Sequence, residues 1–461
     1  MNRLRHLSLA TLCALALPAW AQPASVAAPH AHQAGEPKFE LGGVLNPSWQ
    51  SRAHALSHRD KGLGLGHSDV NLDASLTPWL KGRLSAVAHS DHHKIETEIE
   101  EAYLEAPALP GGLQLRAGRF LSQLGYLNEM HPHTDDFVMR PVLHRAFLGG
   151  HYFDNGLRLN WIAPTPFYWR LGGEVMRGKR LPTLASSSTT GAWTLGTRMG
   201  SDLGNSASWQ LGVSTLRHRA GASGAAGAVH HEHEAEPTGE AAPEASHAHS
   251  HGAAFFGRRM DVIEGVWKWA PDGNARARQL RLSAEFARVG DIGEAQDSGR
   301  RHSAWYVSAV YRFRPQWEIG VRLDQLHALA RHEEAFEVAR LQERSLSLAW
   351  KPDHMMTVRL QFTNQRDLGG FAAASEIKPA NAVHLQVVRS FGAHGAHAYG
   401  CCGSGRRHFA RHVHAGWPAG QPAGERCAQH FCLRTRVGGA RQGDRAGCAD
   451  FFSHPCTSGP A

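Results

Sequence analysis

The sequence predicts an all-β fold: a transmembrane antiparallel β-barrel of about 16 strands, with short periplasmic turns and long extracellular loops. Two observations predict it. Between Leu41 and Phe391, stretches of roughly ten residues alternate apolar and polar side chains, the period of a strand with one apolar and one polar face. The connectors between these stretches also alternate, between tight turns and long polar loops.

The first element is a secretory signal peptide over Met1–Ala21, followed by a short periplasmic leader over residues 22–38. Arg3 and Arg5 supply the positive start, and Leu7–Leu17 supplies the apolar stretch before a small-x-small cleavage pattern. This run is shorter than the ~20 residues that a membrane-spanning helix needs, and no other segment is long and apolar enough. A membrane-spanning form of this chain must therefore be a closed sheet.

The predicted barrel covers residues 39–399, and its connectors set the strand count. The tight turns carry Pro and Gly, which fix the turn angles and interrupt central strands. They are Thr77–Trp79, Leu109–Gly112, Ala163–Pro166, Asp202–Asn205, Ala270–Asn274, Arg314–Gln316 and Lys351–Asp353. The predicted outer loops are Ser51–Lys61, Ser90–Thr97, Leu121–Phe153, Gly178–Thr190, His218–Ala253, Gly290–Arg301, Ala328–Phe336 and Asp367–Pro379. Seven turns and eight loops join sixteen strands.

The alternation within strands assigns their faces. In a barrel of this kind the polar face lines the lumen. The predicted lumen-lining residues are Glu101, Tyr103, Glu105, Gln114, Arg116, Arg158 and Arg170. A soluble β-sandwich would alternate as well. Aromatic residues close to the short turns, such as Trp79, Trp161 and Trp350, favour the barrel because aromatic girdles mark the membrane interface.

The two ends of the chain limit the function. About fifteen residues lie between the signal and the first strand, whereas a folded domain needs ~50, so no plug for energised import is predicted. Residues 400–461 form a tail that lacks strand periodicity and holds six of the seven cysteines. These are Cys401, Cys402, Cys427, Cys432, Cys448 and Cys456. The tail is either a disulfide or metal module or, as we favour, a non-native shifted reading frame, since such barrels usually end on an aromatic residue like Phe391 or Tyr399.

Charge does not indicate a nucleic-acid partner. The formal net charge is +8, but the tail contributes +5 and the signal peptide +2, so the barrel is close to neutral. No GxSxG elbow, HExxH helix or phosphate-binding glycine loop is present. The sequence therefore predicts neither an enzyme nor a required cofactor.

Histidine is the second strong feature, because half of the 32 histidines fall in the predicted outer loops. The richest of these is the His-rich loop, residues 218–253. Its candidate metal ligands are His230, His231, His233, His247, His249 and His251. Imidazole is the commonest ligand for zinc, copper and nickel, and histidine-rich tracts are a compositional metal signal. We predict weak, multi-site metal capture; the alternative is a solvated loop whose histidines do nothing specific.

The third predicted outer loop, Leu121–Phe153, is not low-complexity and is expected to fold, with an inward course into the lumen as one option. Its His131, His133 and Asp135 alternate, so in an extended segment all three would point the same way and hold a divalent cation. The blander alternative is that its acidic residues pair with Arg140 and Arg145 inside a packed loop.

Two blocks of the chain carry a family resemblance. IEEAYLEAPALPGGLQLRAGRFLSQLGYLNEMHPH (Ile99–His133) and HRAFLGGHYFDNGLRLNWIAPT (His144–Thr165) resemble proteobacterial porin-like outer-membrane proteins, often labelled zinc-regulated outer-membrane proteins or TonB-dependent receptors. The similarity covers roughly Phe39–Tyr399 and implies zinc acquisition under scarcity, with His230–His251 matching the family's His-rich loop. The extension from Gly400 has no counterpart there, and the missing plug means that the receptor label does not imply energised transport.

We therefore predict a porin-like channel in the outer membrane of a Gram-negative bacterium. It would take up small solutes passively, divalent zinc foremost. No cofactor is required, and a bound zinc ion is one option. The alternatives are a general diffusion porin with incidental histidines, and a surface metal-binding or adhesion protein with a blocked lumen. Expected partners are outer-membrane lipid, small solutes or metal ions and, since porins are often trimers, further copies of the chain, but not nucleic acid.

Overall fold

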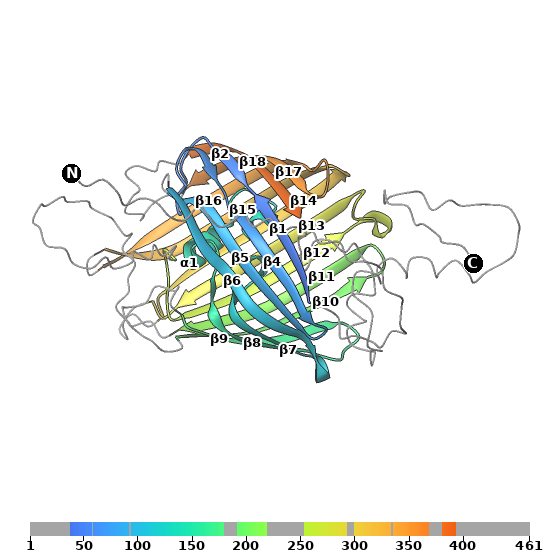
Figure 1. Ribbon diagram of the computed structural model, residues 1–461. Helices are drawn as coiled ribbons and strands as arrows, with labels where there is room; N and C mark the ends of the chain where they lie inside the picture. Colours follow the sequence, from blue (N-terminus) through green and yellow to red (C-terminus); the bar gives the residue numbers. More distant parts are fainter. Residues whose placement is uncertain are drawn as a thin grey trace, which may run out of the picture. The chain divides into compact units, whose positions relative to one another are not determined.

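The computed structural model describes residues 37–57, 59–91, 94–178, 191–218, 253–292, 299–332, 335–367 and 380–392. Within these ranges one antiparallel sheet closes on itself through the pairing of its first and last strands (Figure 1). The strands are β1 (Lys38–Leu45), β2 (Pro47–Gln50), β3 (Gly62–Leu65), β4 (Ser68–Thr77), β5 (Leu80–Asp91), β6 (Lys94–Leu109), β7 (Leu113–Leu121), β8 (Phe153–Ile162), β9 (Tyr168–Met176), β10 (Ala192–Leu203), β11 (Ala207–His218), β12 (Arg259–Trp269), β13 (Gln279–Gly290), β14 (Arg301–Arg314), β15 (Trp317–His332), β16 (Ala335–Trp350), β17 (Met356–Arg366) and β18 (Ala380–Gly392).

These strands make a barrel of sixteen crossings, which confirms the predicted fold. β1 and β2 are interrupted only at Asn46, and both pair with β18 in one continuous register, from Gly42 opposite Gly392 to Gln50 opposite His384. β3 and β4 likewise lie end to end beside β2 and β1. Each of these two pairs therefore crosses the wall once.

All seven predicted tight turns lie at strand junctions, but two predicted outer loops are wrong. β5 and β6 continue through most of Ser90–Thr97, with Asp91 paired to Lys94. β15 and β16 continue through most of Ala328–Phe336, with His332 paired to Ala335. Beyond the lipid both faces of a hairpin are wet, so the apolar–polar alternation ends while the ladder hydrogen bonds continue.

The outer face of the wall is apolar and the inner face is polar. On β15, Val321 and Leu323 are about half exposed, whereas the intervening Arg322 and the following Asp324 are almost completely buried. The same reversal recurs around the wall, with exposed Leu157, Leu195, Leu211, Val307, Leu346 and Leu360 all pointing outward. Lipid rather than water is the solvent that such a surface requires.

Tryptophans gather beside the short turns. Trp317 and Trp350 pair with ring centroids 6.3 Å apart, and Trp161 and Trp169 lie 6.4 Å apart. Trp79, in the turn between β4 and β5, is well exposed. A closed wall with an apolar outer face and an aromatic girdle belongs in the outer membrane of a Gram-negative bacterium. Among the described residues, no helix has the length and apolar content to span a membrane.

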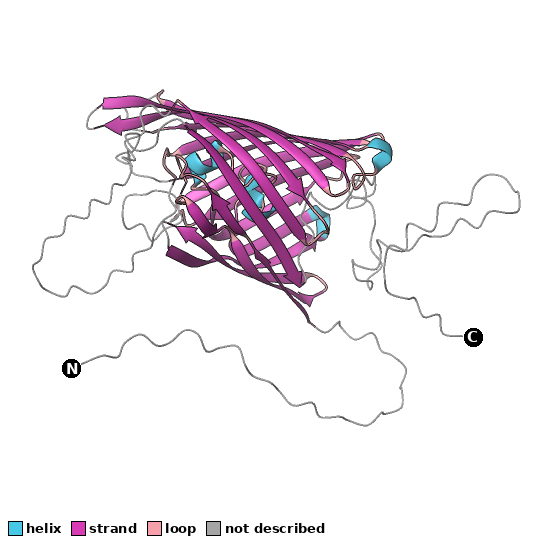
Figure 2. Cartoon of the chain, turned by 90° about the horizontal axis from the view of Figure 1, so that it is seen from above, coloured by secondary structure: helices cyan, strands magenta, loops and turns pink. Residues whose placement is uncertain are grey.

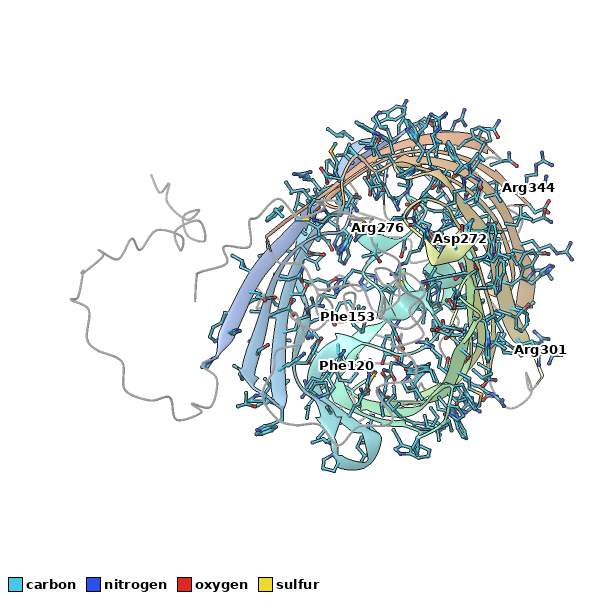
Figure 3. All side chains as sticks on the ribbon, turned by 90° about the vertical axis from the view of Figure 1, so that its right-hand side faces the viewer. Phe120, Phe153, Asp272, Arg276, Arg301 and Arg344 are labelled. Carbon is cyan, nitrogen blue, oxygen red and sulfur yellow. The ribbon has the colours of Figure 1, made fainter. Side chains whose placement is uncertain are left out.

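The third loop, hereafter L3 (Ser122–Tyr152), folds into the lumen (Figures 2 and 3). It contains the short 3₁₀ turns η2 (Leu127–Glu129) and η3 (Pro132–Thr134) and the helix α1 (Val142–Leu148), every residue of which is buried. Gly149 ends α1 in the left-handed conformation that glycine adopts without strain. A hydrophobic core thus forms inside the barrel; it includes Phe120, Leu124, Val142, Leu143, Phe147, Met260, Leu326 and Leu341.

The two remaining 3₁₀ turns of the described residues, η1 (Pro110–Gly112) and η4 (Pro271–Gly273), are short connectors between strands.

Candidate functional site

Wall side chains hold the backbone of L3 from several directions. Glu285 on β13 accepts hydrogen bonds from the Tyr126 and Leu127 amides, both at 2.8 Å. On β17, Gln361 accepts from the Val138 amide at 2.7 Å. Because buried backbone amides need partners, these polar side chains let an irregular loop cross the interior of the barrel.

Ion pairs add to this attachment. Glu129 of L3 pairs with Arg170 on β9 at 2.7 Å and with Arg198 on β10 at 2.8 Å. These guanidiniums outweigh the effect of burial and hold the pKa of Glu129 well below its usual range. Arg145 of α1 pairs with Glu343 on β16 at 2.5 Å. L3 is therefore fastened to opposite parts of the wall.

A polar hollow remains beside L3. It lies against β9–β12, has a cavity volume of about 10 Å³, and is lined in part by Gln123, Arg170, Thr194, Arg198 and Glu264. Both of these arginines also bind Glu129, so positive and negative charges alternate along the hollow. A cavity of this size has room for about one water molecule.

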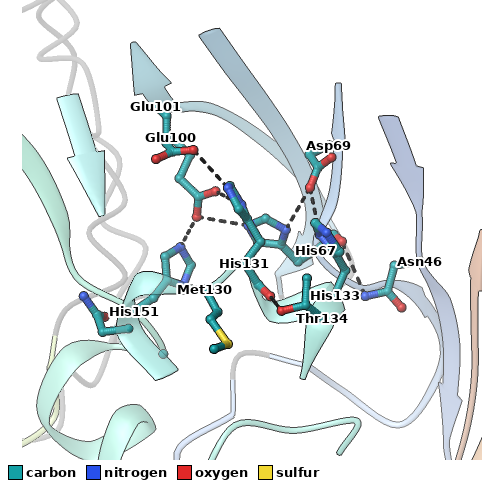
Figure 4. Close-up of polar contacts among 12 residues, drawn as sticks. Asn46, His67, Asp69, Glu100, Glu101, Met130, His131, His133, Thr134 and His151 are labelled. Atoms are coloured by element: carbon teal, nitrogen blue, oxygen red, sulfur yellow. Dashed lines mark hydrogen bonds and ion pairs between the residues drawn. The ribbon is translucent and has the colours of Figure 1, made fainter. Parts of the chain in front are cut away.

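On the other side of L3, histidines and carboxylates meet (Figure 4). This His/carboxylate cluster comprises His67, Asp69, Glu100, Glu101, His131, His133 and His151. Potential ligand atoms of His67, Asp69, His131 and His133 lie within 4.8 Å of one another, as do those of His67, Glu100 and His151. Imidazole and carboxylate groups at this spacing form a set that suits a divalent cation.

Local backbone features build the wall side of the cluster. The register between β5 and β6 shifts where Glu101 faces Ser85 and Ile99 faces Ala86, so Glu100 is the extra residue of a β-bulge. A bulge redirects side chains, and here both consecutive carboxylates are buried inside the wall. On the neighbouring segment, His67 and Asp69 are two residues apart and share the inner face.

L3 supplies the remaining imidazoles. The 3₁₀ turn at Pro132–Thr134 brings the rings of His131 and His133 into a stack with centroids 5.6 Å apart and 19° between planes. Nδ1 of His133 lies 2.8 Å from Oδ2 of Asp69. Nε2 of His151 lies 2.5 Å from Oε1 of Glu100. The cluster therefore forms only when L3 is seated against β4 and β6.

Burial and charge set the protonation of the L3 histidines. Burial lowers the pKa of His133 and that of His151 to about 4, and the nearby carboxylates only partly oppose it. For His131, burial is outweighed by Glu100 and Glu101, which raise its pKa well above its usual value. At neutral pH, His133 and His151 thus carry the neutral ring that metals bind.

The structure brings two of the three predicted L3 ligands together and leaves out the third. His131 and His133 lie in the cluster, whereas Asp135 pairs with Arg140 at 3.0 Å. The assumption of an extended segment was wrong, because the 3₁₀ turn rotates Asp135 away from the two histidines. The alternative pairing with Arg140 is what the structure shows, while Arg145 binds Glu343 instead.

Sequence reasoning missed His67, Asp69, Glu100 and His151 as site residues. The His-x-Asp spacing at residues 67–69 and the paired glutamates at 100–101 were the available signals. Both patterns are too common to single out without the fold. The six candidate ligands His230, His231, His233, His247, His249 and His251, and the tail at 400–461, lie outside the described residues.

The predicted lumen-lining side chains lie opposite the exposed leucines of their strands. Arg116 pairs with Glu105 and stacks 4.0 Å from the centre of the Tyr103 ring. Arg158 pairs with Glu174 at 2.7 Å. Gln114 donates to the Pro107 carbonyl oxygen at 3.0 Å, Arg170 binds Glu129, and Glu101 belongs to the cluster. The inner-face arginines are thus matched by carboxylates.

Comparison with known proteins does not identify a family for this chain. No family model matches the chain. An uncharacterised protein of Aquifex aeolicus (strain VF5) is 33% identical over 126 residues, which are 27% of this chain and 26% of that protein. The chain therefore matches about a quarter of the length of this relative.

Several solved outer-membrane proteins are similar to this chain at low sequence identity. A loop-L8 deletion mutant of OmpT from Vibrio cholerae is 9% identical with a TM-score of 0.49, over 77% of this chain and all of that chain. OprB of Pseudomonas putida is 14% identical with a TM-score of 0.47, over 77% of this chain and 94% of that chain. The outer membrane channel DcaP of Acinetobacter baumannii is 12% identical with a TM-score of 0.47, over 77% and 98%.

Proposed function

We propose that the protein is an outer-membrane channel for the passive uptake of small solutes, with divalent metal ions, zinc foremost, as the favoured cargo. The observation that carries this proposal is the closed barrel with an apolar outer face and a polar inner face. The six histidines of the His-rich loop would concentrate ions at the outer entrance.

The inner surface supports diffusion rather than catalysis or energised import. A barrel of sixteen strands encloses an aqueous passage. L3 narrows that passage, and the hollow against β9–β12 leaves a small polar space beside it. Charged groups at this hollow are paired, as Arg198 is with Glu264 at 2.5 Å. A polar lining with paired charges is compatible with the passage of small hydrated solutes.

Two other functions have some support. A general diffusion porin is favoured by the arginines on the inner face, although Arg116, Arg158 and Arg170 each have a carboxylate partner that offsets their charge. A metal-binding surface protein with a blocked lumen is favoured by the many bonds between L3 and the wall. Conductance separates the surface protein with a blocked lumen from the two channels. Zinc uptake then separates the metal channel from the general diffusion porin.

The test uses the purified full chain in planar bilayers and in liposomes loaded with a zinc-sensitive dye. We expect ion conductance and zinc entry, with zinc entry reduced when His230–His251 is replaced by a Gly/Ser segment of equal length. The matched control changes only the Ala, Glu and Pro residues between the two histidine tracts. Absent conductance would refute the channel, whereas normal conductance with zinc entry insensitive to the replacement would refute metal concentration by the loop.

A further inference from the structure

The His/carboxylate cluster contains buried polar atoms that the protein itself does not satisfy. In the part of the chain that the structure describes, Nδ1 of His67 makes no hydrogen bond, and neither does Oδ2 of Asp69, although this oxygen lies 2.8 Å from Nδ1 of His133. The Asp69 side chain is fully buried, and that of His67 is largely so. Leaving such atoms unsatisfied is costly, and both lie within 4.8 Å of ring nitrogens of His131 and His133, so they indicate a missing ligand.

The second nitrogen of two of these rings is already engaged. Nε2 of His67 lies 3.0 Å from Oε1 of Glu100, and Nε2 of His131 lies 3.0 Å from Oε2 of Glu101, both with hydrogen-bond geometry. An ionised carboxylate can only accept, so each ring donates from Nε2. A ring that donates from Nε2 presents a lone pair at Nδ1 when that nitrogen carries no proton. For His131, a cation would replace the proton that Nδ1 shares with Oε2 of Glu100, 2.8 Å away.

This arrangement matches the way proteins orient metal-binding histidines. A ligating imidazole usually donates its other N–H to a carboxylate, which fixes the tautomer and the ring orientation. The β-bulge at Glu100 supplies both carboxylates, one for each ring. The bulge therefore has a clear role: it turns two consecutive glutamates inward to hold two histidines.

We propose that His67, Asp69, His131 and His133 form a four-ligand site for one divalent cation of the zinc type, which fastens L3 to the wall. Three imidazoles and one carboxylate complete a tetrahedral shell. A zinc site with four protein ligands and no open position is structural, so this ion is resident rather than cargo. The inference goes beyond the proposed function, because it holds whether or not the channel carries zinc.

The origin of the ligands explains what the ion would do. His67 and Asp69 belong to the wall at the start of β4, whereas His131 and His133 flank the 3₁₀ turn of L3. The anchor of L3 at Glu285 lies on β13, across the barrel, whereas that at Gln361 lies on β17, which only β18 and β1 separate from β4. The ion would add an attachment through β4 and fix how far L3 narrows the lumen.

The second group, His67 with Glu100 and His151, is the competing position for an ion. We assign the ion to the first group because Glu100 Oε1 already accepts from His67 Nε2, which uses that nitrogen. His151 then serves as a partner of Glu100, at 2.5 Å. Variants at His151 and His133 consequently distinguish the two positions.

The experiment compares metal content in the full-length protein, refolded with zinc and dialysed against a weak chelator. We expect the native chain to keep about one equivalent more zinc than His67→Ala, Asp69→Ala and His133→Ala. The background from the His-rich loop and the tail cysteines is common to all variants. Substitution by cobalt should give the intense visible absorption of a tetrahedral complex, lost in the same three variants.

Two controls make the result decisive. His54→Ala removes another buried lumenal histidine, stacked on His384 with centroids 4.8 Å apart and outside both groups, and should leave the ion bound. His151→Ala should also retain it, and Glu101→Gln should weaken affinity by about 10–100-fold. Each variant is first shown to be folded by its heat-dependent gel mobility.

Three outcomes would overturn the proposal. Equal zinc content in folded native and His133→Ala proteins would show that the cluster holds no ion. Loss of the ion in His151→Ala but not in His133→Ala would place it at the competing position. An octahedral cobalt spectrum would exclude the closed four-ligand shell. Conductance in the same samples reports on the channel separately, so failure of one proposal leaves the other identifiable.

Discussion

The two sides of L3 are attached to the wall by different chemistry. Toward β13–β17 the contacts use guanidiniums: Arg322 binds Asp324 at 2.8 Å and Glu343 at 3.1 Å, and it also donates to the Met139 carbonyl oxygen at 2.6 Å. Toward β4 and β6, Asp69 and Glu100 face imidazoles instead. An arginine donates several bonds and keeps its charge, so its contacts are complete without a ligand.

One barrel thus holds L3 by a permanent attachment and by a conditional one. On the arginine side, Arg322 is bonded to two carboxylates and a carbonyl oxygen, although Nε of Arg359 on β17 lacks a partner among the described residues. On the histidine side, Nδ1 of His67 and Oδ2 of Asp69 make no hydrogen bond with any described residue, so this attachment depends on whether a cation is bound. Removal of a single side chain should therefore lower the free energy of unfolding strongly on the arginine side. On the histidine side the loss should be small unless metal is present.

The largest effect is expected for Arg322→Ala. It leaves Asp324 and Glu343 as buried carboxylates deprived of a main partner, and breaking a buried pair in this way costs about 3–5 kcal/mol. The measurement is urea-induced unfolding of the refolded protein in detergent or lipid. A loss below about 1 kcal/mol would mean that water already solvates this part of the lumen.

Glu285→Ala should have the next largest effect. It removes the acceptor for the Tyr126 and Leu127 amides and the partner of His144 at 2.9 Å, and each unsatisfied buried group costs about 1–3 kcal/mol. L3 should loosen, so single-channel conductance should rise along with the loss of stability. Glu337→Ala, at an exposed position of β16, is the matched control and should alter neither property.

Asp69→Asn should be mild in metal-free protein. The amide keeps the bond that Asn71 donates to Oδ1 at 2.7 Å, so the change in the free energy of unfolding should stay under about 1 kcal/mol. Added zinc should stabilise the native chain more than this variant, as measured by unfolding with and without zinc. Equal stabilisation of the two would contradict a role for Asp69 as a ligand.

Arg170→Ala should have the smallest effect on stability, because Glu129 retains Arg198 at 2.8 Å. The side chain lines the hollow beside L3, so its loss should shift ion selectivity toward cations. The reversal potential under a salt gradient measures this shift. An unchanged reversal potential would indicate that ions do not pass through this hollow.

The sequence was informative wherever a property depends on neighbours along the chain. The two-residue period of β15 predicts which side chains face lipid, and Pro352 predicts the turn between β16 and β17. It failed at Ser90–Thr97 and Ala328–Phe336, where strands leave the membrane and the alternation stops. It also placed Asp135 beside His131, because the 3₁₀ turn between them leaves no periodic signal.

Local sequence patterns are enough to predict a closed wall, apolar outside and polar inside, since alternation and turn residues are local and a membrane admits no open sheet edge. The course of L3 and the membership of the cluster depend on the folded barrel. Glu100 enters the lumen through a bulge, and His67 meets His131 only after the barrel has closed and L3 has turned inward. Such contacts join residues far apart in the chain, and no local pattern records them.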